Sequence, residues 1–167
     1  MDSRKKIVID TNAILQMLGR HSKYHFLYEK FLNEEYVLCL SNEIMHEYEE
    51  ILGMRASPAV ASLFVKVLEF SENVIRKDPF FKLNLIKKDP DDNKFVDCAF
   101  ACQADYIVTD DAHFSELRQI KFPMLHTKSL DEFAQGEAKD SLWFDGACIP
   151  TQLDIVATFS LQTYVKP

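Results

Sequence analysis

Residues Asp89 to Asp111 of the chain read DPDDNKFVDCAFACQADYIVTDD. This stretch holds seven aspartates in 23 residues, although the whole chain already has a net charge of -7. Its first half has the spacing of a helix, and its second half contains YIVT, a short apolar run typical of a buried parallel strand. A helix followed by such a strand is typical of α/β domains. Like charges this close repel one another, so the aspartates call for an explanation beyond the fold.

The composition limits what the chain can be. Its 167 residues, 47% of them hydrophobic and 12% aromatic, fit one domain with one sizeable core. A net charge of -7 excludes a broad basic footprint for nucleic acid, so a phosphate ligand would need a metal ion or local cations. Apolar runs such as Ala59–Val65 are too short to span a bilayer, and the start MDSRKKIVID has no signal-peptide core. We therefore expect a cytoplasmic protein without a membrane partner.

The cysteine pattern also indicates a cytoplasmic protein. They form no CxxC pair and lie mostly in apolar segments, which is typical of buried, reduced thiols and not of zinc ligands or disulfides. They are Cys39, Cys98, Cys102 and Cys148.

Strand-like and helix-like segments alternate along the chain. Four short apolar runs predict parallel strands, at Lys6–Asp10, Tyr36–Leu40, Tyr106–Thr109 and Pro123–Thr127. Helical spacing predicts helices at His25–Glu34, Glu43–Met54, Pro58–Phe70, Pro90–Gln103 and Leu130–Ala134. Residues 71–88 have no clear pattern. The predicted fold class is α/β, with a parallel sheet flanked by helices on both faces.

Acidic residues gather where the predicted strands end. Asp10 ends the first strand, Asp110 and Asp111 follow the strand at 106–109, and Asp92 opens the helix before that strand. Sites in open parallel sheets are built in the crevice beyond the carboxyl ends of the strands. Asp92 shares a helical stripe with Phe95, so its carboxylate is expected to point inward over the strand ends.

A helix after the second strand supplies a further acid. Glu47 lies one turn into the helix at 43–54 and is best placed to reach the same crevice. Hard divalent cations prefer oxygen ligands and would relieve the repulsion, so we interpret the acids as a site for Mg²⁺ or Mn²⁺.

Structural roles compete with this interpretation for several acids. Asp89 and Asp91 suit helix capping, and Asp10 suits the cap of a helix starting near Ala13. Solvent-exposed positions are expected for Glu43, Glu49, Glu50, Asp97 and Asp105.

Three blocks of sequence carry a resemblance to a known family. They are IVIDTN (Ile7–Asn12), LSNEIMHEYEEIL (Leu40–Leu52) and DPDDNKFVDCAFACQADYIVTDDAHF (Asp89–Phe114). In order and spacing the set resembles a PIN domain, in particular the bacterial toxin-like branch, over about residues 6–134. The resemblance implies a Rossmann-like parallel sheet and RNA hydrolysis that depends on Mg²⁺ or Mn²⁺. It also implies an RNA substrate and an inhibitory antitoxin protein as partners.

Carried over residue by residue, the resemblance implies an acidic quartet with two supporting polar groups. The quartet is Asp10, Glu47, Asp92 and Asp111, and the supporting residues are Asn12 and Thr109. The sequence departs from the family at Asp110, where a small residue is usual, so Asp110 competes with Asp111 as the metal ligand. We expect Asp111, because the Thr-x-Asp pattern from Thr109 places it there.

The predicted organisation is a PIN domain at 1–138 and a C-terminal extension at 139–167, packed on the domain or at an interface such as that of a homodimer. The predicted function is a metal-dependent endoribonuclease, the toxin of a toxin–antitoxin pair. The alternative is a PIN-like module that binds RNA or protein without cutting. Asn12 argues against a haloacid dehalogenase type of phosphatase, and no P-loop motif is present. The other residues that a phospho-receiver domain requires are not evident.

Overall fold

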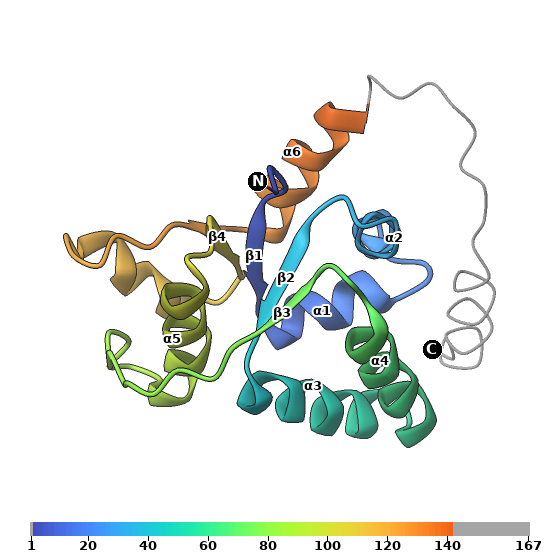
Figure 1. Cartoon of the computed structure of the whole chain (residues 1–167), viewed down its shortest axis with the longest axis horizontal. Coiled ribbons are helices and arrows are strands. Elements are labelled where there is room, and N and C mark those ends of the chain that lie inside the picture. Colours follow the sequence, from blue (N-terminus) through green and yellow to red (C-terminus); the bar gives the residue numbers. More distant parts are fainter. Residues whose placement is uncertain (1, 142–167) are drawn as a thin grey trace.

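The sheet has five parallel strands in the order β3-β2-β1-β4-β5. The structure is a computed structural model that describes residues 2–141 (Figure 1). Its strands are β1 (Lys6–Ile9), β2 (Val37–Leu40), β3 (Val74–Arg76), β4 (Tyr106–Val108) and β5 (Thr127–Lys128). The predicted class, a parallel α/β sheet, is confirmed.

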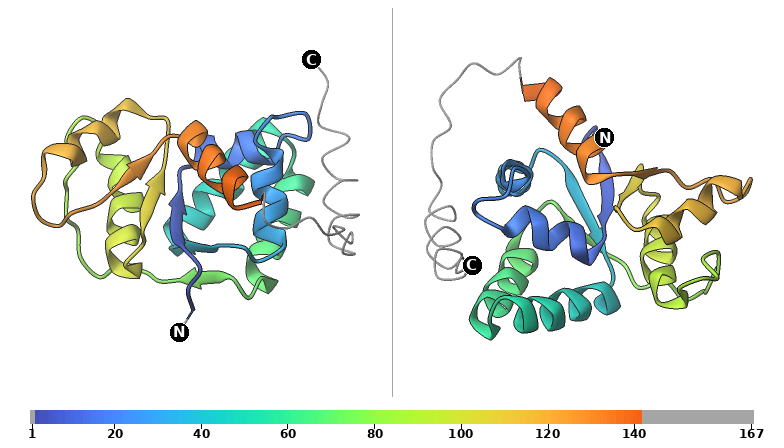
Figure 2. Two further views of the ribbon diagram at one scale, coloured as in Figure 1. Left: turned by 90° about the horizontal axis from the view of Figure 1, so that it is seen from above. Right: turned by 180° about the vertical axis from the view of Figure 1, so that it is seen from behind.

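Helices connect the strands and cover both faces of the sheet. They are α1 (Thr11–Leu18), α2 (His25–Leu32), α3 (Asn42–Arg55), α4 (Pro58–Phe70), α5 (Asn93–Cys102) and α6 (Leu130–Ser141), with 3₁₀ helices η1 (Pro90–Asp92) and η2 (Ala112–Gln119). The chain steps from β1 to β2 to β3, then crosses back to β4. Because parallel crossovers are right-handed, this reversal places α5 on the face opposite α1 to α4 (Figures 1 and 2).

Local sequence explains where the helices begin. The Ser41 hydroxyl accepts from the backbone N–H of Ile44 at the start of α3, and Ser57 accepts from Val60 at the start of α4. Pro58 occupies the first turn of α4, where its missing N–H is not needed. These caps determine where α3 and α4 begin.

The core lies between the sheet and the two helical layers. All four residues of β2 and all three of β4 are buried, as expected for strands covered on both faces. Aromatic side chains from separate elements meet there; the rings of Tyr36 and Phe133 pack edge to face with centroids 5.4 Å apart. The cysteines of the described part, Cys39, Cys98 and Cys102, are buried and free, as predicted.

The helix predicted at Pro90–Gln103 is divided into η1 and α5, and larger differences from the sequence prediction concern β3, β5 and α6. β3 lies inside residues 71–88, which had no assigned pattern. β5 begins only at Thr127, the last residue of the predicted run at 123–127, and Met124 within that run is exposed to solvent. α6 continues past Ala134 and Gly136 to Ser141. A glycine inside a helix costs about 1 kcal/mol relative to alanine, and burial of Leu130 and Phe133 on the same helix offsets that cost.

Two predictions concern residues at or beyond the end of the described part of the chain. The predicted extension at 139–167 falls almost wholly outside them, as does Cys148, and the domain boundary at 138 stays a prediction. Within residues 2–141, no helix is both long enough and apolar enough to span a bilayer.

Candidate active site

The acidic residues meet beyond the carboxyl ends of β1 and β4. These strands are neighbours, yet the chain leaves β1 toward one side of the sheet and arrives at β4 from the other. Such a reversal opens a crevice between the loops that follow the two strands. The backbone N–H of Asp10 donates to the Val108 carbonyl at 3.0 Å, which places the residues after both strands side by side.

Asp10 is the most buried acid of the predicted quartet. Only 7% of the residue is exposed. Its Oδ1 accepts from the backbone N–H of Asn12 at 2.9 Å, and its Oδ2 accepts from the Thr109 hydroxyl at 2.7 Å. Burial raises the pKa of Asp10, and the nearby charges of Asp111 and Glu47 add to the rise, although the two hydrogen bonds oppose it. Asp10 therefore caps α1 and also belongs to the acidic crevice.

The two supporting residues contribute differently. Thr109 donates its hydroxyl proton to Asp10 and accepts on the same oxygen from the backbone N–H of Asp111 at 3.0 Å. It thus joins the loop after β4 to the loop after β1. Asn12 donates its backbone N–H to Asp10, and the residue as a whole is exposed to solvent.

Asp92 and Asp111 converge on His113. The Nδ1 of His113 lies 3.2 Å from Asp111 Oδ1, 3.5 Å from Asp92 Oδ2 and 3.8 Å from Asp89 Oδ2. Asp89, Asp92 and His113 are close enough to hold one metal ion together. Asp89 also accepts from the backbone N–H of Asp91, as the predicted cap should.

The electrostatics around Asp92 are unfavourable for a negative charge. Burial raises its pKa to about 6, helped by the charges of Asp89, Asp111 and Asp10, while the nearby His113 ring opposes the rise. Asp92 Oδ2 and His113 Nδ1 are buried atoms that have no partner with hydrogen-bond geometry among the described residues. Buried polar atoms of this kind call for a ligand that the protein itself does not supply.

The adjacent aspartates Asp110 and Asp111 turn in different directions. Asp110 Oδ1 accepts from the backbone N–H of Leu130 at 2.9 Å and so caps the start of α6. Asp111 faces His113, and its Oδ1 accepts from that residue's backbone N–H at 2.8 Å. The geometry separates the two side chains; the role of Asp111 as a ligand stays a prediction.

Glu47 also reaches the crevice, but it is engaged by protein groups. The Thr11 hydroxyl donates to Glu47 Oε1, and the Lys94 ammonium forms an ion pair with Glu47 Oε2. Neither contact was recognised in the sequence. Thr11 stands between Asp10 and Asn12 in the first block, but no sequence spacing relates Lys94 on α5 to Glu47 on α3.

One predicted location is wrong. Asp97 was expected on the solvent side of its helix, yet only 2% of it is exposed. Its Oδ1 accepts from the backbone N–H of Leu83 at 2.9 Å, and burial raises its pKa. The loop that covers this face belongs to residues 71–88, whose path the sequence pattern did not reveal. Asp105, Glu43, Glu49 and Glu50 are exposed as expected.

His113 and Asp89 were not recognised as members of the cluster. The histidine follows Asp111 by two positions in TDDAHF, and η2, which carries it, was not predicted. Asp89 is the cap of η1 and Asp111 is the cap of η2, and both carboxylates lie near His113 Nδ1 in the same crevice.

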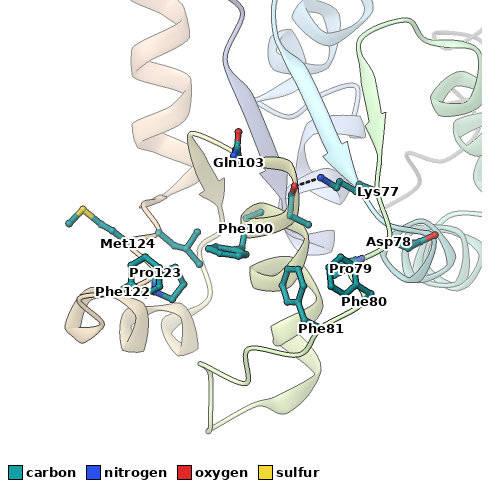
Figure 3. Close-up of a pocket in the computed structure, with 14 residues that line it drawn as sticks. Lys77, Asp78, Pro79, Phe80, Phe81, Phe100, Gln103, Phe122, Pro123 and Met124 are labelled. Carbon is teal, nitrogen blue, oxygen red and sulfur yellow. Dashed lines mark hydrogen bonds between the residues drawn. The ribbon is translucent and has the colours of Figure 1, made fainter.

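A separate apolar groove lies at the other end of α5 (Figure 3). It has a volume of about 510 Å³ and contains none of the acids of the crevice. Phe81, Phe100 and Phe122 line it, and Lys77 bounds it by donating to the Ala101 carbonyl at 2.8 Å. α5 therefore carries the acidic crevice at its first residues and an apolar surface at its last.

Comparison with known proteins identifies the family. An α/β sheet with acids at the carboxyl ends of β1 and β4 is the architecture expected of a PIN domain, and the sequence model described as PIN domain matches residues 6–113. That match spans more than half of the chain, so the protein belongs to the PIN domain family. No curated protein matches the chain.

Two solved structures are similar. VapBC2 from Rickettsia felis, bound to a DNA fragment from its promoter, is 14% identical with a TM-score of 0.53, over 74% of this chain and 98% of that chain. DNA-bound VapBC from Salmonella typhimurium is 15% identical with a TM-score of 0.49, over 75% of this chain and 98% of that chain. The first likeness supports the PIN-like fold.

Proposed function

We propose that the protein is a metal-dependent endoribonuclease that hydrolyses RNA phosphodiesters in the acidic crevice. The observation that carries this proposal is the convergence of Asp10, Asp92 and Asp111 beyond the strand ends, with a buried oxygen of Asp92 left unpartnered. Membership of the PIN domain family supports the nuclease class.

The donor set suits a hard divalent cation. Carboxylate oxygens are the ligands that Mg²⁺ and Mn²⁺ prefer, and an imidazole nitrogen is compatible with Mn²⁺. Asp10, Asp92 and Asp111 form the proposed cation site, with Asp89 and His113 as neighbouring donors. Glu47, the fourth acid of the predicted quartet, borders this site, where Thr11 and Lys94 occupy its oxygens. A cation would relieve the repulsion that raises the pKa of Asp92, and it would satisfy the unpartnered atoms.

The chain's own groups prepare the site. Thr109 holds Asp10 in place through a buried hydrogen bond, and the turn at Asp111 is fixed by the same hydroxyl. When bound, a divalent cation lowers the pKa of a water molecule and stabilises the departing oxygen of the phosphodiester. The reaction needs no nucleophilic side chain.

Substrate and partners follow from the resemblance. Exposed Lys87 and Lys88, beside the crevice, offer local positive charge for phosphates that flank the scissile bond. Single-stranded RNA is the proposed substrate, because its backbone and bases are accessible. The likeness to VapBC2 from Rickettsia felis supports the further proposal that the protein is a toxin, with an antitoxin protein as partner and the cytoplasm as its location. A homodimer stays a prediction.

A cleavage assay tests the activity. Mixed single-stranded RNAs should be cut in the presence of Mg²⁺ or Mn²⁺, cutting should stop with excess chelator, and restoring Mn²⁺ should restore it. DNA strands of the same sequences serve as the substrate control. Intact RNA under all metal conditions would favour the alternative, a PIN-like module that binds without cutting.

A further inference from the structure

Glu47 differs from the other acids of the crevice because both of its oxygens already have protein donors. Thr11 donates to Oε1, and the Lys94 ammonium pairs with Oε2. Asp92, by contrast, has a buried oxygen without a partner. The four predicted ligands are therefore not equivalent in this structure.

Lys94 is held in a position unusual for a lysine. Its side chain is 11% exposed, and its Nζ lies 5.4 Å from the centroid of the Phe95 ring. Burying an ammonium group is unfavourable unless it is paired, and the ion pair with Glu47 offsets that cost. The ring adds a weaker cation–π attraction.

The same helix offers a comparison. Glu43, one turn before Glu47 on α3, pairs with Lys82 at 3.6 Å, and both side chains are more than 60% exposed, at 62% and 64%. That pair is an ordinary surface contact of small energy. Burial distinguishes the Lys94–Glu47 pair from it, and so does the position of Glu47, whose charge acts on Asp10.

We propose that Lys94 is a built-in cation of the acidic site, standing where a second divalent ion would otherwise bind. This inference rests on the proposed function. Asp10, Asp92 and Asp111 hold a single divalent cation, whereas Glu47 is a positioning residue that holds Lys94. Lysine has three N–H donors, so the ammonium can pair with Glu47 and still donate to a phosphate oxygen of RNA.

Metal affinity should therefore distinguish the three ligand aspartates from Glu47. Removing Glu47's charge should weaken Mn²⁺ binding by less than about tenfold, through lost Coulomb attraction alone, because its oxygens serve Thr11 and Lys94 and not the ion. Removing the charge of Lys94 should free Glu47 and add net negative charge to the crevice. Coulomb attraction then predicts Mn²⁺ binding that is about tenfold tighter, or a second bound ion.

Isothermal titration calorimetry with Mn²⁺ on the full chain, without RNA, tests this. The wild type should bind one ion, as should Glu47→Gln and Lys94→Arg, while Lys94→Met should bind more tightly or bind two. Lys82→Met and Glu43→Gln are the matched controls and should behave as the wild type. Thermal melting of each variant shows that it is folded, and Glu47→Gln tests the inference independently if Lys94→Met unfolds.

The outcomes distinguish this inference from the proposed function. The role of Lys94 would be overturned if the wild type bound two ions, or if Glu47→Gln lost more than about tenfold in Mn²⁺ affinity. Neither result would contradict the proposed metal-dependent nuclease. Absence of any Mn²⁺ binding by the folded wild type would overturn both.

Discussion

Asp92 combines burial and repulsion in one carboxyl group. Its pKa is about 6 in the folded chain, against an ordinary value of 3.8, chiefly because of burial and then because of neighbouring aspartates. Between these pH values the folded chain binds more protons than the unfolded chain. Stability from this group is thus fully present below pH 3.8 and is lost as the pH rises to about 6.

The first prediction concerns this pH window. In metal-free buffer, the free energy of unfolding of the wild type should fall by at most about 3 kcal/mol between pH 4 and pH 6.5. Asp92→Asn should lack this fall, because it has no carboxyl group to titrate at this position. Urea unfolding at several pH values measures it. A variant with the same pH dependence as the wild type would show that Asp92 is not the group responsible.

The second prediction separates the adjacent aspartates. Asp111→Asn should weaken Mn²⁺ binding by at least about tenfold, because Asp111 faces His113 in the crevice. Asp110→Asn should bind Mn²⁺ as the wild type does, since its carboxylate accepts from Leu130 at the start of α6. Calorimetric titration decides the matter, and a larger loss for Asp110→Asn would reverse the assignment.

Among the elements, the junction between η1 and α5 positions the crevice. Asn93 is buried there and bridges to the backbone of Ile86, donating to its carbonyl at 2.7 Å and accepting from its N–H at 2.9 Å. A further bond from Asn93 reaches the Pro90 carbonyl at 3.1 Å. These contacts hold the loop before η1 against the start of α5. Asp92, the last residue of η1, directly precedes Asn93 and is held in place with it.

The third prediction tests that junction. Asn93→Ala leaves both backbone groups of Ile86 without their side-chain partner, which should lower the free energy of unfolding by about 2–4 kcal/mol. It should also weaken Mn²⁺ binding, because Asp92 loses its fixed position. Denaturant unfolding and metal titration check the two effects, with exposed Asp91→Ala as the control. A stable variant with unchanged metal affinity would contradict the positioning role.

Elements with strong local patterns could be predicted, and those fixed by distant contacts could not. β1, β2 and α3 were recognisable because apolar spacing and the Ser41 cap are local features. β3 is only three residues long, and its pairing with β2 depends on residues far along the chain. Similarly, Asp97 was misplaced because Leu83, which covers it, lies in the segment without a pattern.

The candidate site shows the same division. Strand ends placed Asp10 and Asp111 near one another, because parallel strands share a carboxyl edge. The ion pair between Lys94 and Glu47 joins α5 to α3, and no spacing rule relates two such helices. His113 depends on η2, a 3₁₀ helix without a clear periodic pattern.

At the scale of the whole molecule, metal binding and folding are coupled. The proposed ligands come from η1 and the loops after β1 and β4, and the neighbouring Glu47 comes from α3, so the site exists only in the folded chain. A ligand that binds the folded state stabilises it by mass action.

The fourth prediction follows from that coupling. Mn²⁺ at a hundredfold excess over its Kd should stabilise the wild type by about 2.7 kcal/mol and raise its melting temperature. Asp10→Asn should abolish most of this shift, whereas Asp105→Asn, which removes an exposed acid at the start of β4, should retain it. Calorimetric melting with and without Mn²⁺ gives the result; equal shifts in both variants would place the ion elsewhere.

The central claim is that the acidic crevice is where RNA is cut. Its most direct test is the rate of RNA cleavage, at saturating Mn²⁺ and with enzyme in excess over RNA, for the wild type, Asp92→Asn and Asp91→Asn. The two variants remove one charge each from adjacent positions, but Asp92 lies in the crevice and Asp91 is exposed. We predict a loss of at least about a hundredfold for Asp92→Asn and a nearly unchanged rate for Asp91→Asn. Equal rates for all three proteins would contradict the claim.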